Sequence, residues 1–297
     1  MTTLLAFVRL TRPLFLLGGV VGVALGAAVA TWSGHRLDGV TYLWIQALVS
    51  AFQLMVHYAN DYFDRAGDVF AQRTAWSGGS GVLTSGALHP RVALLAAVVC
   101  AALGLAATAR FWFGANATVG WIGLGMFALA WSYSAPPLRL AARGFGELTT
   151  VLVVAVLVPA AGYAAFAGRL DALLENALVA PAAAMLAMML CVELPDAGAD
   201  LAAGKRTLVV RWGPARTWRM VTIAAAVAGA SAVTGALKLH AGAGALALLP
   251  AAVATVALLW LSLRDPRPAS MAFWGVALYA TITGGLAAAY GLAVAWR

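Results

Sequence analysis

Two short stretches hold six of the eleven acidic residues in this chain of 297 residues. Asn60, Asp64 and Asp68 follow one another at i, i+4 and i+8, whereas Glu193, Asp196 and Asp200 lie at i, i+3 and i+7. These spacings place each set on one face of a helix, although Pro195 is expected to kink or restart the second helix. Like charges at these spacings repel one another, so a cation is expected beside each face.

The side chains of both stretches offer oxygen atoms, which suit a hard divalent cation. Mg²⁺ commonly binds one or two carboxylates together with substrate phosphates and water. A single acidic loop would be read as ordinary polar surface, but two matched stretches favour a shared Mg²⁺ site around a phosphorylated substrate. The metal ligands expected from the two stretches are Asn60, Asp61, Asp64, Asp68, Asp196 and Asp200.

Basic residues near the acidic stretches indicate an anionic substrate. Lys205 and Arg206 follow Asp200 closely, and lysine binds phosphate as a point charge whereas arginine can bind it with two parallel bonds. Arg73 precedes a glycine-rich stretch, 77–81, whose backbone N–H groups could approach a substrate, although a flexible cap is an equal alternative. Arg139 follows a proline turn in the fourth loop between apolar segments.

The elements that must position these residues are membrane helices. Hydrophobic residues make up 63% of the chain and charged residues only 10%, whereas soluble domains need about a quarter. At roughly 20 apolar residues per span, the chain accommodates nine transmembrane helices in one domain over residues 1–297. The expected spans are about 14–32, 40–59, 92–113, 117–133, 148–168, 172–194, 218–238, 242–263 and 271–296.

The distribution of basic residues predicts the topology. Fourteen Lys and Arg residues fall at the N-terminus and in the even-numbered loops, against five on the other side. This bias places the N-terminus and both acidic stretches in the cytoplasm, and the protein in the inner, cytoplasmic membrane as a multi-pass protein. Basic runs interleaved with aromatic residues are absent from the sequence, so no nucleic acid is expected as a partner, and no partner protein is indicated.

Taken together, the motifs resemble the UbiA superfamily of intramembrane aromatic prenyltransferases. The pattern N-D-x-x-D-x-x-x-D is matched by Asn60 to Asp68, and the second pattern, D-x-x-x-D followed by G-K-R-T, by Asp196 to Thr207. Within the superfamily, the sequence is most similar to the 1,4-dihydroxy-2-naphthoate polyprenyltransferase branch of menaquinone synthesis. Enzymes of that branch often carry asparagines before the second aspartate motif, where this chain has Glu193-Leu194-Pro195.

The resemblance implies an all-α fold in which the helices surround a central cavity open to the cytoplasmic side. It implies Mg²⁺-dependent transfer of a polyprenyl group from an allylic diphosphate to an aromatic small molecule, with the isoprenoid tail lying among membrane lipid. The residues that it implies to be catalytic are Asp64, Asp68, Asp196, Asp200 and Lys205. Those that it implies to bind substrate are Tyr62, Arg73, Trp76, Tyr133, Arg139 and Arg206.

Other functions fit parts of the pattern. A prenyltransferase with another acceptor, or an intramembrane terpene cyclase of the same superfamily, would ionise the same diphosphate. An ion-coupled transporter also places charged groups inside a membrane protein, but usually near the midplane. A CDP-alcohol phosphotransferase is disfavoured because neither acidic stretch contains an Asp-Gly pair. His57, one turn before Asp61, could orient that carboxylate, although a structural role at a helix end is favoured.

Overall fold

The computed structural model describes residues 2–70, 76, 79–114, 116–239, 245–264 and 268–295. The regular secondary structure in these residues is helical. Long apolar segments become helices because a helix satisfies its own backbone hydrogen bonds, which lipid cannot do. The longer helices are α2 (Pro13–Trp32), α3 (Gly39–Asp64), α4 (Pro90–Trp112), α5 (Ala117–Ser134), α8 (Ala172–Glu193), α10 (Leu208–Lys238), α12 (Leu249–Arg264) and α13 (Pro268–Ala295).

Seven helical segments in the described residues are long and apolar enough to cross a membrane. They are Thr3–Trp32, Gly39–Asp64, Pro90–Trp112, Gly146–Ala167, Asn176–Ala202, Leu208–Lys238 and Ser270–Ala295. Helices α5 and α12 occupy the remaining two ranges expected from the sequence, and α12 is a shorter apolar helix. The prediction of an all-helical membrane protein is therefore confirmed, whereas the number of nine crossings stays a prediction.

Several helix bounds differ from those expected. A short helix α1 (Thr3–Thr11) precedes α2, and the chain breaks between them at Arg12, whose φ is 49°. The fifth expected span consists of α6 (Gly146–Thr150), a π-helix over Val151–Leu157, and α7 (Val158–Ala167). Helix α10 begins ten residues before its expected start at 218, with a kink at Gly213 ahead of Pro214. Local backbone breaks of this kind leave little trace in average hydropathy.

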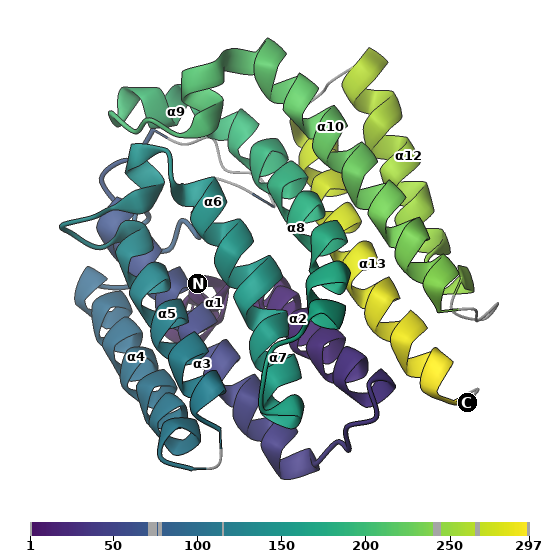
Figure 1. Ribbon diagram of the computed structural model, residues 1–297. Coiled ribbons are helices and arrows are strands. Elements are labelled where there is room, and N and C mark those ends of the chain that lie inside the picture. The colour runs from purple at the N-terminus through teal and green to yellow at the C-terminus, as the bar shows by residue number, and fades with distance from the viewer. Residues whose placement is uncertain are drawn as a thin grey trace.

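The helices form two groups joined by a central pair (Figure 1). Helices α3, α4 and α5 pack against one another on one side, and α8, α10, α12 and α13 on the other. Between them α2 packs against both α7 and α13. A Cβ at Gly26 of α2 would lie 2.6 Å from the backbone nitrogen of Tyr163 on α7, so the two backbones approach closely, as small residues allow in membranes.

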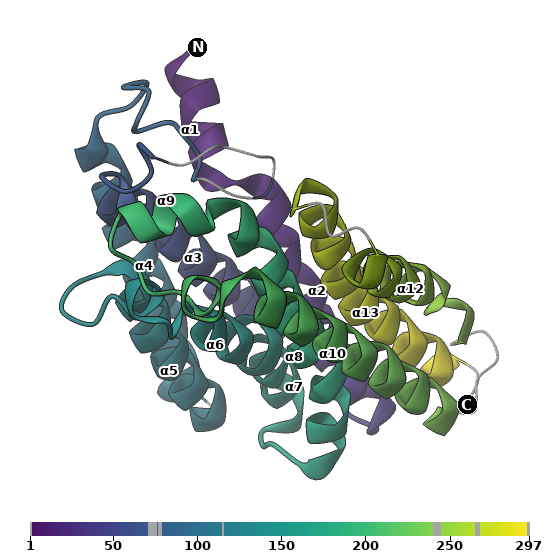
Figure 2. The same cartoon turned by 90° about the horizontal axis from the view of Figure 1, so that it is seen from above.

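Polar chain segments meet at one end of the bundle. Helix α8 ends at Glu193, a 3₁₀ turn covers Leu194–Asp196, and α9 (Ala197–Ala202) follows, so the break expected at Pro195 is confirmed. In the view from above, α9 lies beside the end of α3 (Figure 2). A Cβ at Gly67, just after α3, would lie 3.1 Å from the Cβ of Ala203. This contact brings the two acidic stretches together.

Candidate active site

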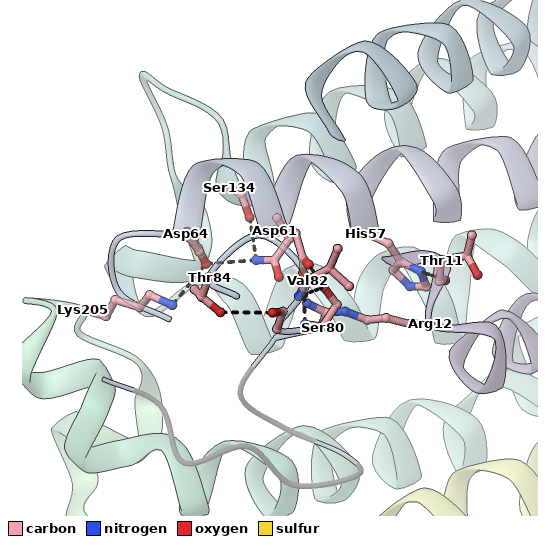
Figure 3. Close-up of polar contacts among 12 residues, drawn as sticks. Thr11, Arg12, His57, Asp61, Asp64, Ser80, Val82, Thr84, Ser134 and Lys205 are labelled. Atoms are coloured by element: carbon pink, nitrogen blue, oxygen red, sulfur yellow. Dashed lines mark hydrogen bonds and ion pairs between the residues drawn. The ribbon is translucent and has the colours of Figure 1, made fainter. Parts of the chain in front are cut away.

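Lys205 joins the two acidic stretches. Its Nζ lies 3.1 Å from Oδ2 of Asp64 at the end of α3 (Figure 3). The same Nζ lies 3.3 Å from Oδ1 of Asp200 on α9. The three side chains are largely buried, with exposed fractions of 16% for Lys205, 6% for Asp64 and 14% for Asp200. Burial opposes the charge of Lys205, but Asp64 and Asp200 outweigh it and raise the pKa of the ammonium above its ordinary value.

Asn60 fixes the position of Asp64. The Nδ2 atom of Asn60 donates to Oδ2 of Asp64 over 2.9 Å, and also lies 3.0 Å from Oγ of Ser134 at the end of α5. Asn60 and Asp64 are one helical turn apart on α3, as their spacing predicted. Because Oδ2 of Asp64 also contacts Lys205, one carboxylate oxygen links α3 to the segment before α10.

Asp61 faces a different set of partners. It forms an ion pair with Arg12 and accepts hydrogen bonds from the hydroxyl and the backbone N–H of Ser80 (Figure 3). Asp61 is 3% exposed and Ser80 is 6% exposed. Both carboxylate oxygens of Asp61 are therefore occupied by protein groups. The structure places this expected metal ligand apart from the Lys205 group, as an anchor for Arg12 and for the turn at Ser80.

Asp68 is not on the helix expected for it. Helix α3 ends at Asp64, and residues 65–69 form turns in which the backbone N–H of Asp68 donates to the Asp64 carbonyl over 3.0 Å. A Cβ at Gly79, where φ is 70°, would press against Oδ2 of Asp68, so the carboxylate lies on this glycine turn. Burial raises the pKa of Asp68 to about 6, Lys205 opposes the rise, and Asp61 and Asp64 add to it.

The second acidic stretch continues into the helix bundle. Asp196 is half-buried in the 3₁₀ turn before α9. Glu193, the last residue of α8, lies near the Glu147 carboxyl group on α6. Glu147 is completely buried, and one of its oxygens accepts the backbone N–H of Leu208 at the start of α10. The kink at Pro195 therefore turns Glu193 and Asp200 toward different partners, Glu147 and Lys205.

Aromatic side chains flank the acidic groups. The rings of Tyr62 and Phe63 meet edge to face with centroids 5.1 Å apart, and Arg65 lies 4.6 Å from the Tyr62 centroid. Trp76 lies between Phe15 and Phe273, with centroid distances of 6.2 and 6.4 Å. These π-faces are suited to stabilising positive charge without capturing it as a nucleophile would.

A third predicted aromatic residue, Tyr133, stands in α5 next to Ser134. Its side chain is half-buried and lies near Thr150, the last residue of α6. A Cβ at Gly146 would lie 3.5 Å from the Tyr133 ring. The ring therefore packs on the α5–α6 connection, beside the residues that hold the start of α10.

Two of the predicted arginines, Arg139 and Arg206, do not join the Lys205 group. Arg139 is exposed, with a φ of 45°, at the start of the 3₁₀ turn Leu140–Arg143. Arg206 is also exposed, although its backbone N–H donates to the carbonyl of Ala142 over 2.9 Å. Arg73 and the residues 77–78 of the glycine-rich stretch lie outside the described part of the chain. A role for these arginines toward a diphosphate stays a prediction.

His57 has the structural role favoured from the sequence, since its Nδ1 contacts the carbonyl of Thr11 at the end of α1 over 2.9 Å. Three other residues of the site were not expected. Arg12 was not among the predicted site residues, and Ser80 belonged only to the glycine-rich stretch 77–81. Glu147 lies outside both acidic stretches. Its burial against α10 depends on packing between distant segments, which no local spacing reports.

The donor set fits a divalent cation. Within the described residues, no group of three or more His, Cys, Asp and Glu side chains is already arranged around one point. However, carboxylates from both stretches converge on the Lys205 ammonium, and the Asp68 carboxylate is near enough for its charge to act on Lys205. Oxygen atoms of this kind and number are the ligands that Mg²⁺ prefers, so the residues present fit the predicted cofactor.

A model of the UbiA prenyltransferase family matches residues 19–282, which include both acidic stretches, Glu147 and Lys205. The chain belongs to the UbiA prenyltransferase family. The resemblance deduced from the two aspartate motifs is therefore confirmed, and so is the expectation of a prenyltransferase at the level of the family.

Two relatives of known name are similar to this UbiA family member. A 1,4-dihydroxy-2-naphthoate octaprenyltransferase of Mycobacterium tuberculosis is 30% identical over 224 residues, 73% of each chain. A protoheme IX farnesyltransferase of Klebsiella pneumoniae is 29% identical over 168 residues, which span 56% of this chain and about half, 52%, of the relative. Both are prenyltransferases by name, but the names imply different acceptors.

Solved structures share the UbiA fold. A UbiA homologue from Aeropyrum pernix superimposes with a TM-score of 0.70 at 17% identity, covering 90% of this chain and 96% of that one. A homologue from Archaeoglobus fulgidus, solved with GPP and Mg²⁺, gives 0.67 at 18% identity over 98% of this chain and 100% of that one. At such low identity these likenesses establish the fold alone.

Proposed function

We propose that this protein transfers a polyprenyl group from an allylic diphosphate to an aromatic acceptor, with 1,4-dihydroxy-2-naphthoate as the acceptor, in menaquinone biosynthesis. One observation carries the proposal: the buried Lys205 ammonium contacts Asp64 and Asp200, so both aspartate motifs face one cationic point. A diphosphate bridged to acidic side chains by Mg²⁺ needs this combination of carboxylates and a nearby fixed cation.

The division of labour among the residues follows from their chemistry. Asn60, Asp64, Asp68, Asp196 and Asp200 would hold Mg²⁺, which when bound neutralises the diphosphate and increases its tendency to leave. Lys205 lies between the motifs and stabilises the negative charge that grows on the leaving oxygen as the carbon–oxygen bond breaks. With substrate present, Lys205 exchanges some contact with Asp64 and Asp200 for contact with phosphate oxygens.

The surrounding side chains suit the carbon skeleton of the substrate. Tyr62 and Trp76 offer π-faces to the allylic cation. The acceptor ring attacks this cation, and the ring then loses a proton. A polyprenyl tail is long and apolar, and burying each CH₂ in lipid or protein contributes about 0.8 kcal/mol. This gain is a physical reason for a site at the end of a membrane bundle.

The identity of the acceptor rests on sequence. The naphthoate enzyme of Mycobacterium tuberculosis is matched over more of its length than the farnesyltransferase is, and the motifs resemble the naphthoate branch. The homologue from Archaeoglobus fulgidus binds GPP and Mg²⁺, which supports a prenyl diphosphate as the donor. A family member with another acceptor, such as protoheme, or a terpene cyclase is the second candidate.

The proposal includes the topology. Nine helices cross the inner membrane with the N-terminus in the cytoplasm, and the central cavity opens to that side, where both acidic stretches meet the charged diphosphate head group. The seven long apolar segments support a multi-pass arrangement, and the excess of basic residues near the acidic stretches supports the orientation.

A single assay separates the candidate functions. Purified protein in nanodiscs receives Mg²⁺ and a radiolabelled polyprenyl diphosphate, with and without 1,4-dihydroxy-2-naphthoate. Diphosphate release that requires the naphthoate, with a prenylated naphthoate product, supports the proposal. Release without any acceptor, together with a cyclised hydrocarbon, supports a cyclase instead. No release with any acceptor, protoheme included, would contradict prenyl transfer and revive an ion-coupled transporter.

A further inference from the structure

Glu147 is a buried carboxylate outside the two acidic stretches. It stands in the first turn of α6 with no exposed surface. Its Oε1 accepts a hydrogen bond from the backbone N–H of Leu208, the first residue of α10, which lies 61 positions away in the sequence. Three residues before Leu208 the chain presents Lys205. Burying a carboxylate costs free energy, and this hydrogen bond offsets only part of that cost. The position of Glu147 therefore needs a functional explanation.

The α5–α6 connection forms hydrogen bonds with the segment that carries Lys205 and with the start of α10. The backbone N–H of Arg206 donates to the carbonyl of Ala142 over 2.9 Å, and Arg211 Nη2 donates to the carbonyl of Arg143 over 2.8 Å. At Gly144, where φ is 79°, a Cβ would collide with the carbonyl oxygen of Arg206, so the two backbones touch. Among these contacts, that of Glu147 is the buried one, whereas Arg143, Arg206 and Arg211 are exposed.

The position of the ammonium follows from the backbone beneath it. The backbone N–H of Lys205 donates to the carbonyl of Asp200 over 2.8 Å, which fixes the segment on the α9 side. On the other side, Glu147 fixes it at Leu208, where Thr207 Oγ1 also accepts the N–H of Val210 over 3.3 Å. The four residues from Lys205 to Leu208 are therefore held at both ends, and a long flexible lysine is restricted to one location.

We propose that Glu147 is a positioning residue that holds the Lys205 ammonium between Asp64 and Asp200. This inference rests on the proposed function, in which Lys205 acts on the leaving diphosphate. Glu147 itself need not touch the substrate. When the Glu147 carboxylate is removed, the Leu208 N–H loses its buried hydrogen-bond partner. The start of α10 then relaxes, and Lys205 moves away from Asp64 and Asp200.

Lysine reactivity tests the proposal without any turnover. The chain has only two lysines, Lys205 and Lys238, and Lys238 is exposed at the other end of α10. In the wild type, burial and the ion pairs protect Lys205 from acylation by an N-hydroxysuccinimide ester, while Lys238 reacts freely. In Glu147→Ala, we expect the acylation rate of Lys205 relative to that of Lys238 to rise about tenfold. This factor corresponds to the loss of one hydrogen bond to a charged group. Glu147→Gln keeps an acceptor oxygen and should keep Lys205 protected.

A control separates positioning from general loss of structure. Cys191 is fully buried in α8, so its reaction with a maleimide reports opening of the bundle. Exposure of Lys205 with Cys191 still protected supports the proposal. An unchanged Lys205 in a folded Glu147→Ala protein overturns it. If both residues react, the alanine variant has lost its fold, and Glu147→Asp, which draws the oxygen back by one CH₂, takes its place. For that variant, exposure of Lys205 with Cys191 protected supports the proposal, and any other result overturns it.

Kinetics then connect the position of Lys205 to catalysis. In the diphosphate-release assay, Glu147→Ala should lower kcat about tenfold with a smaller change in KM, and Glu147→Gln should restore it. In a Lys205→Ala background the same change at Glu147 should have almost no further effect, because the positioned group is gone. Additive losses would contradict positioning. If the wild-type protein showed no prenyl transfer, the proposed function would be refuted. The labelling of Lys205 would still test the positioning role of Glu147, because labelling needs no turnover.

Discussion

At the residue scale, the basic residues near the acidic stretches divide into those that face the site and those that face water. Lys205, in the segment before α10, is held by two carboxylates, whereas Arg216, eleven residues further on and within α10, is exposed. An exposed charge is screened and contributes little to a site, but a cation in a buried, preorganised position acts strongly on developing charge.

We therefore expect Lys205→Ala to lower kcat roughly a hundredfold, about 3 kcal/mol, with a smaller change in KM. Arg216→Ala in the same nanodiscs should retain most of the activity, because its charge serves membrane orientation. Steady-state kinetics with one diphosphate substrate make the comparison. Equal activity of the two variants would show that Lys205 is a surface charge like Arg216, and the diphosphate clamp would then be sought at Arg139 or Arg73.

The contrast between Asp61 and Asp64 leads to a second prediction at this scale. The oxygens of Asp61 are occupied by Arg12 and Ser80, whereas Asp64 faces Lys205 and the second motif. Asp64→Asn should raise the Mg²⁺ concentration for half-maximal activity at least about tenfold, since it removes a charged ligand. Asp61→Asn should lower turnover by loosening Arg12 while leaving the Mg²⁺ requirement in place. If both variants raised the Mg²⁺ concentration for half-maximal activity equally, Asp61 would be a metal ligand like Asp64.

At the scale of elements, close backbone packing keeps the bundle around the site. The crossing of α2 and α7 leaves no room for a Cβ at Gly26, where backbone atoms of α7 are in the way. Gly125 on α5 is a helical glycine at which a Cβ would meet no neighbouring atom within 4 Å. The two residues are alike in sequence terms, and only the packing around them differs.

Gly26→Ala should therefore destabilise the protein by about 1–3 kcal/mol or more, because two backbones must move apart. Gly125→Ala should be neutral or stabilising by up to about 1 kcal/mol, since alanine is the better helix former. Thermal unfolding in detergent, followed by maleimide reaction at Cys191, measures both variants. If Gly26→Ala unfolds at the wild-type temperature, the close crossing of α2 and α7 is wrong.

At the scale of the whole molecule, orientation decides which compartment supplies the diphosphate. Basic residues concentrate on the side of the acidic stretches, and the acidic stretches lie together at one end of the bundle. With nine crossings, the N-terminus and that end are cytoplasmic and the C-terminus lies outside.

Reporter fusions test this topology in cells. A reporter inserted in the loop after Asp200 should be active in the cytoplasm, and a reporter fused after Arg297 should be active on the opposite side. An insertion in the loop 33–38 serves as a control for the outer side. Signals from the same side for the first two positions would mean an even number of crossings between Asp200 and the C-terminus, against the three that we expect there.

Local rules explain what could be deduced from the sequence alone. The apolar runs determined the helices, because a backbone in lipid has to form its own hydrogen bonds. The i, i+4 spacing correctly placed Asn60 and Asp64 on one turn, and Pro195 correctly marked the break before α9. The two aspartate motifs together were enough to identify the family, since both had to be present in order and at the right distance from the Lys-Arg pair.

Tertiary structure alone decided which of these groups meet. Asp68 left the expected helix face because α3 ends four residues earlier, and Asp61 paired with Arg12 because the break after α1 turns that arginine inward. The buried bond between Glu147 and Leu208 likewise joins segments 61 positions apart. Periodicity describes the face of one helix, whereas these contacts depend on how several helices pack against one another, and that arrangement is a property of the whole fold.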